Sequence, residues 1–397
     1  MSKLNNTILG VNISHDTSIA VVKNGVLVDV FEEERCRRKK YWSPKETEQT
    51  LLQSIEQKIN VDAIDEVVFA SFDRRDYTYN VDSELTQDRI RTREFKEDFS
   101  HRQLTREKLE NLAEKWEEFN FVFCPNSGDE TIMDDIITEQ LGLPRGEYQY
   151  NVDHHIHHAY CGLNLAPHMD NAIIIVMDGG GCRKLWDMYP THQEIESIYY
   201  GYKDEDGMHI EPQYQKLSNL RFIHDISEQF PNELSSFLEC PLNDKVTLDG
   251  VDYELTSWPS MGMNFSNASH ALGTDKLGRA AGKVMGMASY GHHQPQVFNR
   301  FNIAHELELV AYDYTVELIK KAIDYNPDCK NIILSGGYAL NCTNNYKYLQ
   351  KFPNHQIFVD PIPHDGGTAA GAALQMYQQM VDGIEPAYCK PSVWSES

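Results

Sequence analysis

The chain has 397 residues, of which 41% are hydrophobic and 24% are charged, and this composition is typical of a globular protein with a substantial core. The formal net charge is −24, from 36 basic and 60 acidic residues. Such a charge disfavours broad electrostatic binding to nucleic acid, although it leaves room for a local basic groove.

The spacing of the cysteines and the hydropathy of the chain indicate where in the cell the protein is found. The eight cysteines are scattered and form no Cys-x-x-Cys pair, which indicates reduced thiols in an intracellular protein. The N-terminus has no apolar segment of the signal-peptide kind, and the longest aliphatic run, residues 172–177, is too short to cross a bilayer. We therefore expect a cytoplasmic protein without a membrane partner.

Three short β-rich runs open the chain, at residues 8–13, 17–22 and 26–31. Asn24-Gly25, between the second and third runs, is a strong hairpin signal. The first turn contains His15 and Asp16, and its backbone N–H groups could hold a phosphate or a hydroxyl. An ordinary polar turn explains this spacing equally well.

Charged stretches follow. Residues 32–40 run from acidic to basic, which is usual for a solvated face, although the basic half, with Lys39, could bind an anion. We expect helices at 44–59, 104–119 and 129–141, and a strand from residue 66. The highly charged stretch at 73–119 is interpreted as an insertion that covers an edge of the core.

Four of the sixteen histidines lie within residues 154–158, after a predicted strand at 147–152. His154 and His158 are four positions apart, so on a helix both imidazoles share one face, with Asp153 as the expected N-cap. Two stacked imidazoles are half of a transition-metal site. The alternative is a surface helix that is merely rich in histidine.

Residues 171–178 have the composition of a buried strand, and Asp178 at its end precedes three glycines. Asp178 is well placed to bind a metal or a metal–phosphate complex, and Gly179 and Gly180 allow positive φ and close approach of a ligand. A plain turn is the alternative. Further strands are expected up to residue 202, and residues 204–259 are interpreted as irregular, a candidate substrate-facing segment.

Several anion-binding patterns lie in the last third of the chain. Arg279 and Lys283 are four apart and on a helix could together hold phosphates. A long helix is expected at 301–325 and strands at 331–334 and 356–359. Each of these strands leads through a glycine turn into a helix, an arrangement that favours anion binding. The turn residues singled out are Gly336, Gly337, Asn341, Asp365, Gly366 and Gly367.

Together these units predict an α/β protein whose strands end at a common cleft. Their order resembles the actin, sugar-kinase and heat-shock ATPase architecture, a two-lobed fold with a duplicated β-sheet core and an inter-lobe cleft that holds a nucleotide. We expect an N-terminal lobe at 1–168, with the insertion at 73–119, and a C-terminal lobe at 169–397, with the insertion at 204–259.

The resemblance extends to one family, the O-carbamoyltransferases of antibiotic and nodulation-factor synthesis, whose transferase domain is related to tRNA threonylcarbamoyl-transferases. The motifs that carry it span nearly the whole chain and occur in the family's order. They are Ile8–Asp16, Glu33-Glu34-Arg35 with Arg37–Lys40, Asp153-His154-His155 with His158-Ala159, Asp178-Gly179-Gly180, Gly282-Lys283-Val284-Met285-Gly286, Leu334–Asn341 and Asp365–Ala373.

The resemblance implies transfer of a carbamoyl group from carbamoyl phosphate to a hydroxyl, with ATP as co-substrate and carbamoyl-adenylate as intermediate. It implies a divalent metal, Fe²⁺ in the first place and Mn²⁺ or Mg²⁺ as alternatives, bound by His154, His158 and Asp365, with Asp178 as a ligand or near neighbour. His15 is the candidate base, since an imidazole titrates near neutral pH. The residues assigned to phosphate or nucleotide are Asp16, Lys39, Gly179, Gly180, Arg279, Lys283, Gly336, Gly337, Asn341, Gly366 and Gly367.

Three features depart from the family. Its familiar members carry a further domain that makes carbamoyl-adenylate, whereas this sequence stops at Ser397, so either a partner supplies the intermediate or this chain performs both steps. Ser289 stands where the family usually has proline. His157 stands where a small residue is expected.

The sequence does not identify the hydroxyl compound that accepts the carbamoyl group. It could be a sugar or natural product, or the hydroxymethyl group of a modified nucleobase, including one in DNA held at a local site. Two other functions compete, namely threonylcarbamoyl transfer to tRNA with a partner, and a non-enzymatic actin-like nucleotide-binding module. The latter would leave the histidine cluster unexplained. A homodimer is also compatible with the sequence.

Overall fold

The computed structural model describes residues 5–12, 16–38, 40, 63–70, 149–150, 154–182, 192–218, 245–256, 258–275, 280–294, 296–297 and 299–384. The chain forms two compact units. The first consists of Met1–Val152 together with Thr368–Ser397, and the second is Asp153–Gly367. The sequence places a division at residue 168, which lies inside the second unit. The expected cleft between lobes stays a prediction.

The first unit contains a five-stranded sheet in the order β3-β2-β1-β4-β5. Neighbours β1, β2 and β3 pair antiparallel, whereas β4 pairs parallel with both β1 and β5. A short helix, α1, follows β3. The elements are β1 (Thr7–Asn12), β2 (Ser18–Lys23), β3 (Val26–Glu32), α1 (Glu33–Arg37), β4 (Glu66–Phe69) and β5 (Gln149–Tyr150). The predicted opening meander is confirmed.

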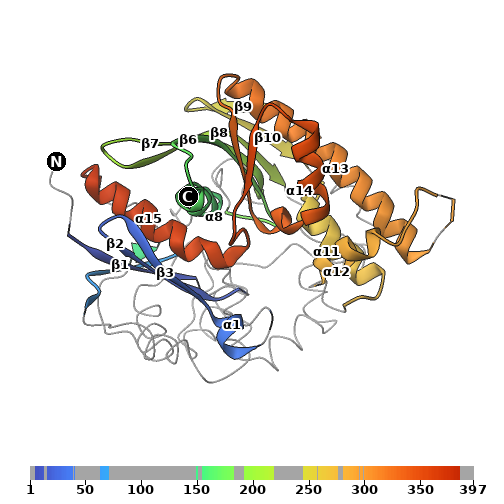
Figure 1. Cartoon of the computed structure of the whole chain (residues 1–397), viewed down its shortest axis with the longest axis horizontal. Helices are drawn as coiled ribbons and strands as arrows, with labels where there is room; N and C mark the ends of the chain where they lie inside the picture. Colours follow the sequence, from blue (N-terminus) through green and yellow to red (C-terminus); the bar gives the residue numbers. More distant parts are fainter. Residues whose placement is uncertain are drawn as a thin grey trace, which may run out of the picture. The chain divides into compact units, whose positions relative to one another are not determined.

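Helix α15 (Thr368–Val381) packs on this sheet, across β1, β2 and β3 (Figure 1). The approach is close because β1 carries a glycine there: a Cβ on Gly10 would lie 1.9 Å from the carbonyl oxygen of Ala369. The predicted Asn-Gly hairpin is also confirmed, since Asn24 and Gly25 have φ of 53° and 76°. Gly25 lies against the ring of Tyr377.

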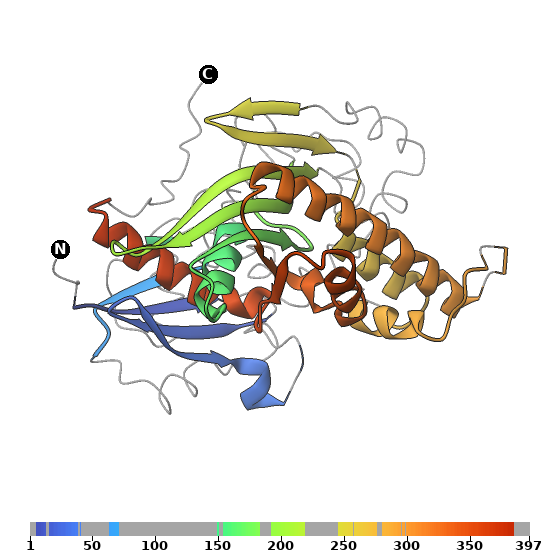
Figure 2. The same ribbon diagram turned by 45° about the horizontal axis from the view of Figure 1, so that its top comes forward.

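The second unit is built on a seven-stranded sheet in the order β12-β11-β6-β7-β8-β10-β9 (Figure 2). The strands are β6 (Asn171–Met177), β7 (Gln193–Lys203), β8 (Met208–Ser218), β9 (Lys245–Leu248), β10 (Val251–Thr256), β11 (Asn331–Ser335) and β12 (Gln356–Val359). The helices are α8 (His154–Leu165), α11 (Met261–Ala271), α12 (Ala281–Ala288), α13 (Arg300–Tyr325) and α14 (Cys342–Lys351), with 3₁₀ turns η4 (Gly337–Leu340) and η5 (Asp365–Gly367).

Strand β6 is the centre of this unit because both of its faces are buried. Successive side chains of a strand point to opposite faces. Ile173 and Ile175 pack into the core formed with α11, α12 and α13, whereas Ile174 and Val176 pack into the core formed with α8. A continuous run of aliphatic residues is the pattern expected of a strand covered on both sides.

The stretch at 204–259 is not irregular throughout, and that prediction is wrong where the structure describes it. Strands β8, β9 and β10 lie within it. Their pattern was hard to recognise because β8 is exposed or half-buried over most of its first half and contains Pro212. In the described part of the chain, the strands predicted at 331–334 and 356–359 and the helix at 301–325 are confirmed.

Other expectations fall outside the described residues: the helices at 44–59, 104–119 and 129–141 and the charged insertion at 73–119. Two sheets flanked by helices confirm the α/β class. None of the described helices is both long and apolar enough to cross a membrane.

Asp360 follows β12 and is a buried carboxyl group in the second unit, only 2% exposed. The hydroxyl of Ser335 donates to its Oδ2 at 2.7 Å and the backbone N–H of Ile362 to its Oδ1 at 2.9 Å. Burial nevertheless dominates and raises the pKa of Asp360 from 3.8 to about 6. The carboxyl group thus binds its proton more tightly in the folded protein than in the unfolded chain.

We predict that Asp360→Asn flattens the pH dependence of stability between about pH 4 and 6. Because the folded-state pKa is raised, the stability associated with the protonated carboxyl is complete below pH 4 and is lost as pH rises through 6. The difference between wild type and variant should change by up to about 3 kcal/mol across this window. Urea unfolding at several pH values measures it, and parallel curves would contradict the assignment.

Candidate metal centre

Helix α8 places His154 and His158 on one face, as their spacing predicts. Both side chains are buried, and their Nε2 atoms lie 3.2 Å apart. The rings meet edge to face, with centroids 4.8 Å apart. The expected N-cap, Asp153, lies outside the described residues. The imidazole pair is therefore an interior feature of the second unit, and the alternative of a histidine-rich surface helix is wrong.

Asp178 follows β6 directly, and its carboxylate has two distinct partners. Its Oδ2 lies 3.2 Å from Nε2 of His154, and its Oδ1 accepts a 2.9 Å hydrogen bond from the backbone N–H of Gly337. The turn that brings this N–H close requires glycine: Gly336 has φ of 86°, and a Cβ there would lie 2.2 Å from the carbonyl oxygen of Met177.

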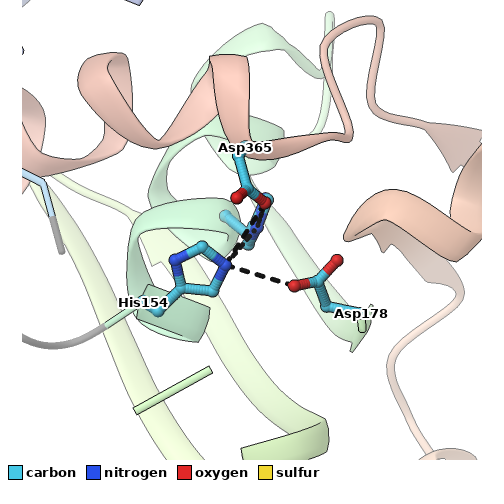
Figure 3. Close-up of side chains that lie close together, drawn as sticks. His154, Asp178 and Asp365 are labelled. Carbon is cyan, nitrogen blue, oxygen red and sulfur yellow. Dashed lines mark hydrogen bonds and ion pairs between the residues drawn. The ribbon is translucent and has the colours of Figure 1, made fainter. Parts of the chain in front are cut away.

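The turn η5 supplies a second carboxylate, that of Asp365. Its Oδ1 lies 3.4 Å from Nε2 of His154 and 3.8 Å from Nε2 of His158. The turn packs tightly against the preceding chain, because a Cβ on Gly367 would lie 2.3 Å from the carbonyl oxygen of Ile362. Figure 3 shows one ring nitrogen of His154 facing the carboxylates of both Asp178 and Asp365.

We call these four residues, His154, His158, Asp178 and Asp365, the metal-ligand cluster. Each offers one ligand atom, and all four atoms lie within 4.8 Å of one another. Ligands bound at about 2.1 Å lie roughly 3.0 Å apart in an octahedral site and roughly 3.4 Å apart in a tetrahedral one. Four of the six pairs of ligand atoms are 3.2 to 3.8 Å apart, which is near these values, and all six pairs lie within 4.8 Å. The residues therefore fit a divalent metal with nitrogen and oxygen ligands.

The pKa shifts of the residues in the metal-ligand cluster also favour a divalent cation. Burial opposes protonation of His154, but Asp365 and Asp178 outweigh it and hold its pKa well above the ordinary value. Burial, together with the charge of His154, lowers the pKa of His158 to about 4. Burial also opposes ionisation of Asp178, yet His154 holds the pKa of this carboxyl well below its usual range. One proton shared among two carboxylates and two imidazoles leaves a net negative charge, which a divalent cation in place of that proton would neutralise.

A second layer of polar side chains supports α8, and the sequence did not indicate it. The backbone N–H of His154 donates to Sγ of Cys182 at 3.3 Å, and the N–H of Cys182 donates to Glu194 at 3.1 Å. Nδ1 of His155 lies 2.8 Å from the hydroxyl of Ser197. Glu194 lies in a stretch where the sequence predicts strands, but its burial and its contacts are seen only in the paired strands.

The glycines assigned to cofactor binding lie beside the cluster. Gly179 and Gly180 follow Asp178, but positive φ is absent from Gly179, Gly180 and Gly181, so the positive φ expected there is wrong, whereas the close approach of a ligand stays a prediction. Close packing explains two of them instead. A Cβ on Gly180 would lie 2.6 Å from the amide of Gln193, and one on Gly181 would lie 2.7 Å from the ring of His155. Gly366 donates its N–H to Nδ1 of His364 at 3.1 Å.

Asn341 has a clear role in the fold. Its Oδ1 accepts from the N–H of Asn344 at 3.3 Å, which caps α14, and its Nδ2 donates to Glu308 at 3.0 Å. Lys283 is exposed on α12. Asp16 is buried in the first unit, where its carbonyl accepts from Asn12. The predicted residues His15, Lys39 and Arg279 lie outside the described residues.

The sequence pattern of the family described as "Carbamoyltransferase N-terminus" matches residues 7–308 and 300–374. This match covers most of the chain and includes all four residues of the metal-ligand cluster. The chain belongs to this carbamoyltransferase family.

Two relatives show how far the similarity extends. The protein sll1178 of Synechocystis sp. is 24% identical over 391 residues, which cover 94% of this chain and 57% of the relative. Nodulation protein NolNO of Sinorhizobium fredii is 47% identical over 51 residues, 13% of this chain and 8% of that protein. The chain thus spans little more than half of the relative that it matches along most of its length.

Among solved structures, HypF from T. kodakarensis is similar, with a TM-score of 0.48 and 14% identity over 96% of this chain and 48% of that one. A full-length HypF in a phosphate- and nucleotide-bound form has a TM-score of 0.46 and 11% identity, over 95% of this chain and 56% of that one.

We predict that Gly336→Ala destabilises the protein by about 2 kcal/mol or more, because the methyl group would meet the backbone of Met177 at an unfavourable φ. Thermal unfolding measures the loss. Gly286→Ala is the matched control: Gly286 lies in helix α12 with open space around its Cβ position, so alanine there should be neutral or stabilising. Equal melting temperatures for both variants would contradict the packing argument.

Proposed function

We propose that this protein is an O-carbamoyltransferase that moves a carbamoyl group from carbamoyl phosphate to a hydroxyl acceptor, through carbamoyl-adenylate formed with ATP. Membership of the carbamoyltransferase family supports the group transferred. The observation that carries the site is the convergence of four buried or nearly buried ligand atoms from three separate elements of the second unit.

We propose a divalent metal at the metal-ligand cluster. Two histidines with carboxylates are the ligand set that non-haem Fe²⁺ favours, so Fe²⁺ is the first candidate and Mn²⁺ or Mg²⁺ are alternatives. When bound, such a metal would hold a phosphate and withdraw charge as the carbamoyl–phosphate bond breaks. Asp178 would be kept in position by the N–H of Gly337, and His154 by the contact of its backbone with Cys182.

Other roles follow from the family resemblance alone. His15 would accept the proton of the acceptor hydroxyl, and Lys39, Arg279 and Lys283 would neutralise phosphate charge. The glycine turns after β6 and β11 would approach the nucleotide. Either this chain or a partner would form the carbamoyl-adenylate. The acceptor would be a sugar, a natural product or the hydroxymethyl group of a nucleobase.

We predict that His154→Ala lowers metal affinity by about 100-fold or more, since it removes the ligand that contacts both carboxylates. Metal content after dialysis, measured by plasma mass spectrometry, tests this, and circular dichroism checks the fold. His293→Ala is the control, because His293 is an exposed histidine that pairs with Glu306 on α13. Equal metal content in both variants would exclude the cluster as the metal site.

We predict that protein incubated with ATP, carbamoyl phosphate and Fe²⁺ releases AMP and adds a carbamoyl group, a mass increase of about 43 Da, to one class of acceptor. The panel would contain aminoglycosides, nucleotide sugars, hydroxymethylated nucleosides and hydroxymethylated DNA. Separately synthesised carbamoyl-adenylate distinguishes a missing activating partner from a wrong reaction. No product with that reagent and any acceptor would contradict carbamoyl transfer to this panel.

A further inference from the structure

A second candidate site lies in the second unit, apart from the four metal ligands. It is a cavity of about 230 Å³ where the start of β7 and the end of β8 meet helices α11 and α13. None of its lining residues has a place in the proposed metal chemistry. They are Ile195, Lys216, Trp258, Pro259, Met261, Asn264 and Tyr314.

One side of the cavity is polar, and its groups form a chain. The ammonium group of Lys216 donates to the hydroxyl of Tyr314 at 3.0 Å, and this hydroxyl donates to Glu196 at 2.8 Å. Lys216 also pairs with Glu254 at 3.5 Å. Two carboxylates therefore already face this ammonium group, so a further anion would meet repulsion. Among the described residues, Tyr314 and Glu254 use two of the three N–H donors of Lys216, and the third can donate a hydrogen bond to a neutral ligand.

The other walls are apolar and firmly held. Trp258 is 62% exposed, whereas Pro259 beside it is buried. The backbone around Trp258 is fixed at both ends, since its carbonyl accepts from Ser218 at 2.7 Å and its N–H donates to Thr256 at 3.1 Å. An indole that remains exposed on a fixed backbone is a flat surface on which a ring can stack.

Asn264 adds a hydrogen-bonding edge. Within the described part of the chain, the contact given for its Nδ2 is a long one, 3.9 Å, with the sulfur of Met261 on the preceding turn. A carboxamide carries a donor and an acceptor in one plane, a fork that matches a ring with a carbonyl next to an N–H or amino group. A sugar ring can also stack on an indole through its C–H face, but its hydroxyl groups project from saturated carbons and do not form such a coplanar donor–acceptor edge.

The wall of this cavity is joined to the turn that carries Asp178. The hydroxyl of Ser260 donates to the carbonyl of Gly179 at 3.0 Å. A Cβ on Gly262 would lie 3.2 Å from the backbone nitrogen of Gly179 and 3.3 Å from the carbonyl carbon of Asp178. The start of α11 therefore contacts the metal-ligand cluster's backbone while Met261 and Asn264 line the cavity.

We infer that this cavity binds the neutral pyrimidine base of a nucleoside, stacked on Trp258 with its carbonyl and amino edge on Lys216 and Asn264. Taken with the proposed carbamoyl transfer, on which this step rests, the base belongs to the hydroxyl acceptor. On this proposal the acceptor hydroxyl is carried by a nucleobase, and the coplanar edge formed by Lys216 and Asn264 favours it over a sugar.

Isothermal titration calorimetry of the full chain with 5-hydroxymethyl-2′-deoxycytidine, thymidine and methyl glucoside tests the inference. We expect both nucleosides to bind with a Kd of about 1 mM or tighter, and the glucoside not to bind. Trp258→Ala and Asn264→Leu should each weaken nucleoside binding about tenfold, while Trp258→Phe should retain most of it.

Asn267→Leu is the matched control, because Asn267 lies on the same helix but does not line the cavity. Any of three results would overturn the inference. They are an equal loss of nucleoside affinity in both asparagine variants, binding of the glucoside alone, and no binding of either nucleoside. The titration contains no metal, ATP or carbamoyl phosphate, so failure of carbamoyl transfer leaves it unaffected. Conversely, absence of nucleoside binding overturns the pocket assignment even if another acceptor is carbamoylated.

Discussion

The second unit is organised around two acidic side chains in its interior. Asp178 and Asp365 lie in the same small volume. Buried carboxylates are costly unless cationic or hydrogen-bonding groups compensate them. His154, His158 and the N–H of Gly337 provide part of this compensation. The end of β6, the turn η5 and the first turns of α8 must therefore meet at one point, which also suits a divalent cation.

That meeting point depends on rigid surroundings. β6 is packed by α8 on one face and by the α11–α13 core on the other, so the strand that leads to Asp178 has little freedom. Gly336 permits the following turn to touch β6, and through that contact a backbone N–H reaches the carboxylate. Preorganised ligands of this kind bind a metal without a large cost of rearrangement.

Local sequence was sufficient for part of this picture and insufficient for the rest. The four-residue spacing of His154 and His158 predicts their shared helical face, and the aliphatic run before Asp178 predicts a strand that ends there. Strand β8 was missed because its exposed first half contains Pro212, and pairing with β7 and β10 decides its structure. The N–H of Gly337 could not be assigned, since it is 159 positions from Asp178 and only the packing of β11 beside β6 brings them together.

The second unit is formed by one continuous segment of the chain, and the metal-ligand cluster joins the two ends of that segment. Asp153–Gly367 is contiguous, whereas the first unit requires both the opening strands and α15, which is made after the second unit. During synthesis, the second unit can therefore complete its sheet before the first unit has all of its parts. His154 and Asp365 lie next to the two ends of that contiguous segment, 3.4 Å apart. An ion bound between them in the folded protein would link the two ends of this segment, and would stabilise it because the unfolded chain does not hold the ligands together.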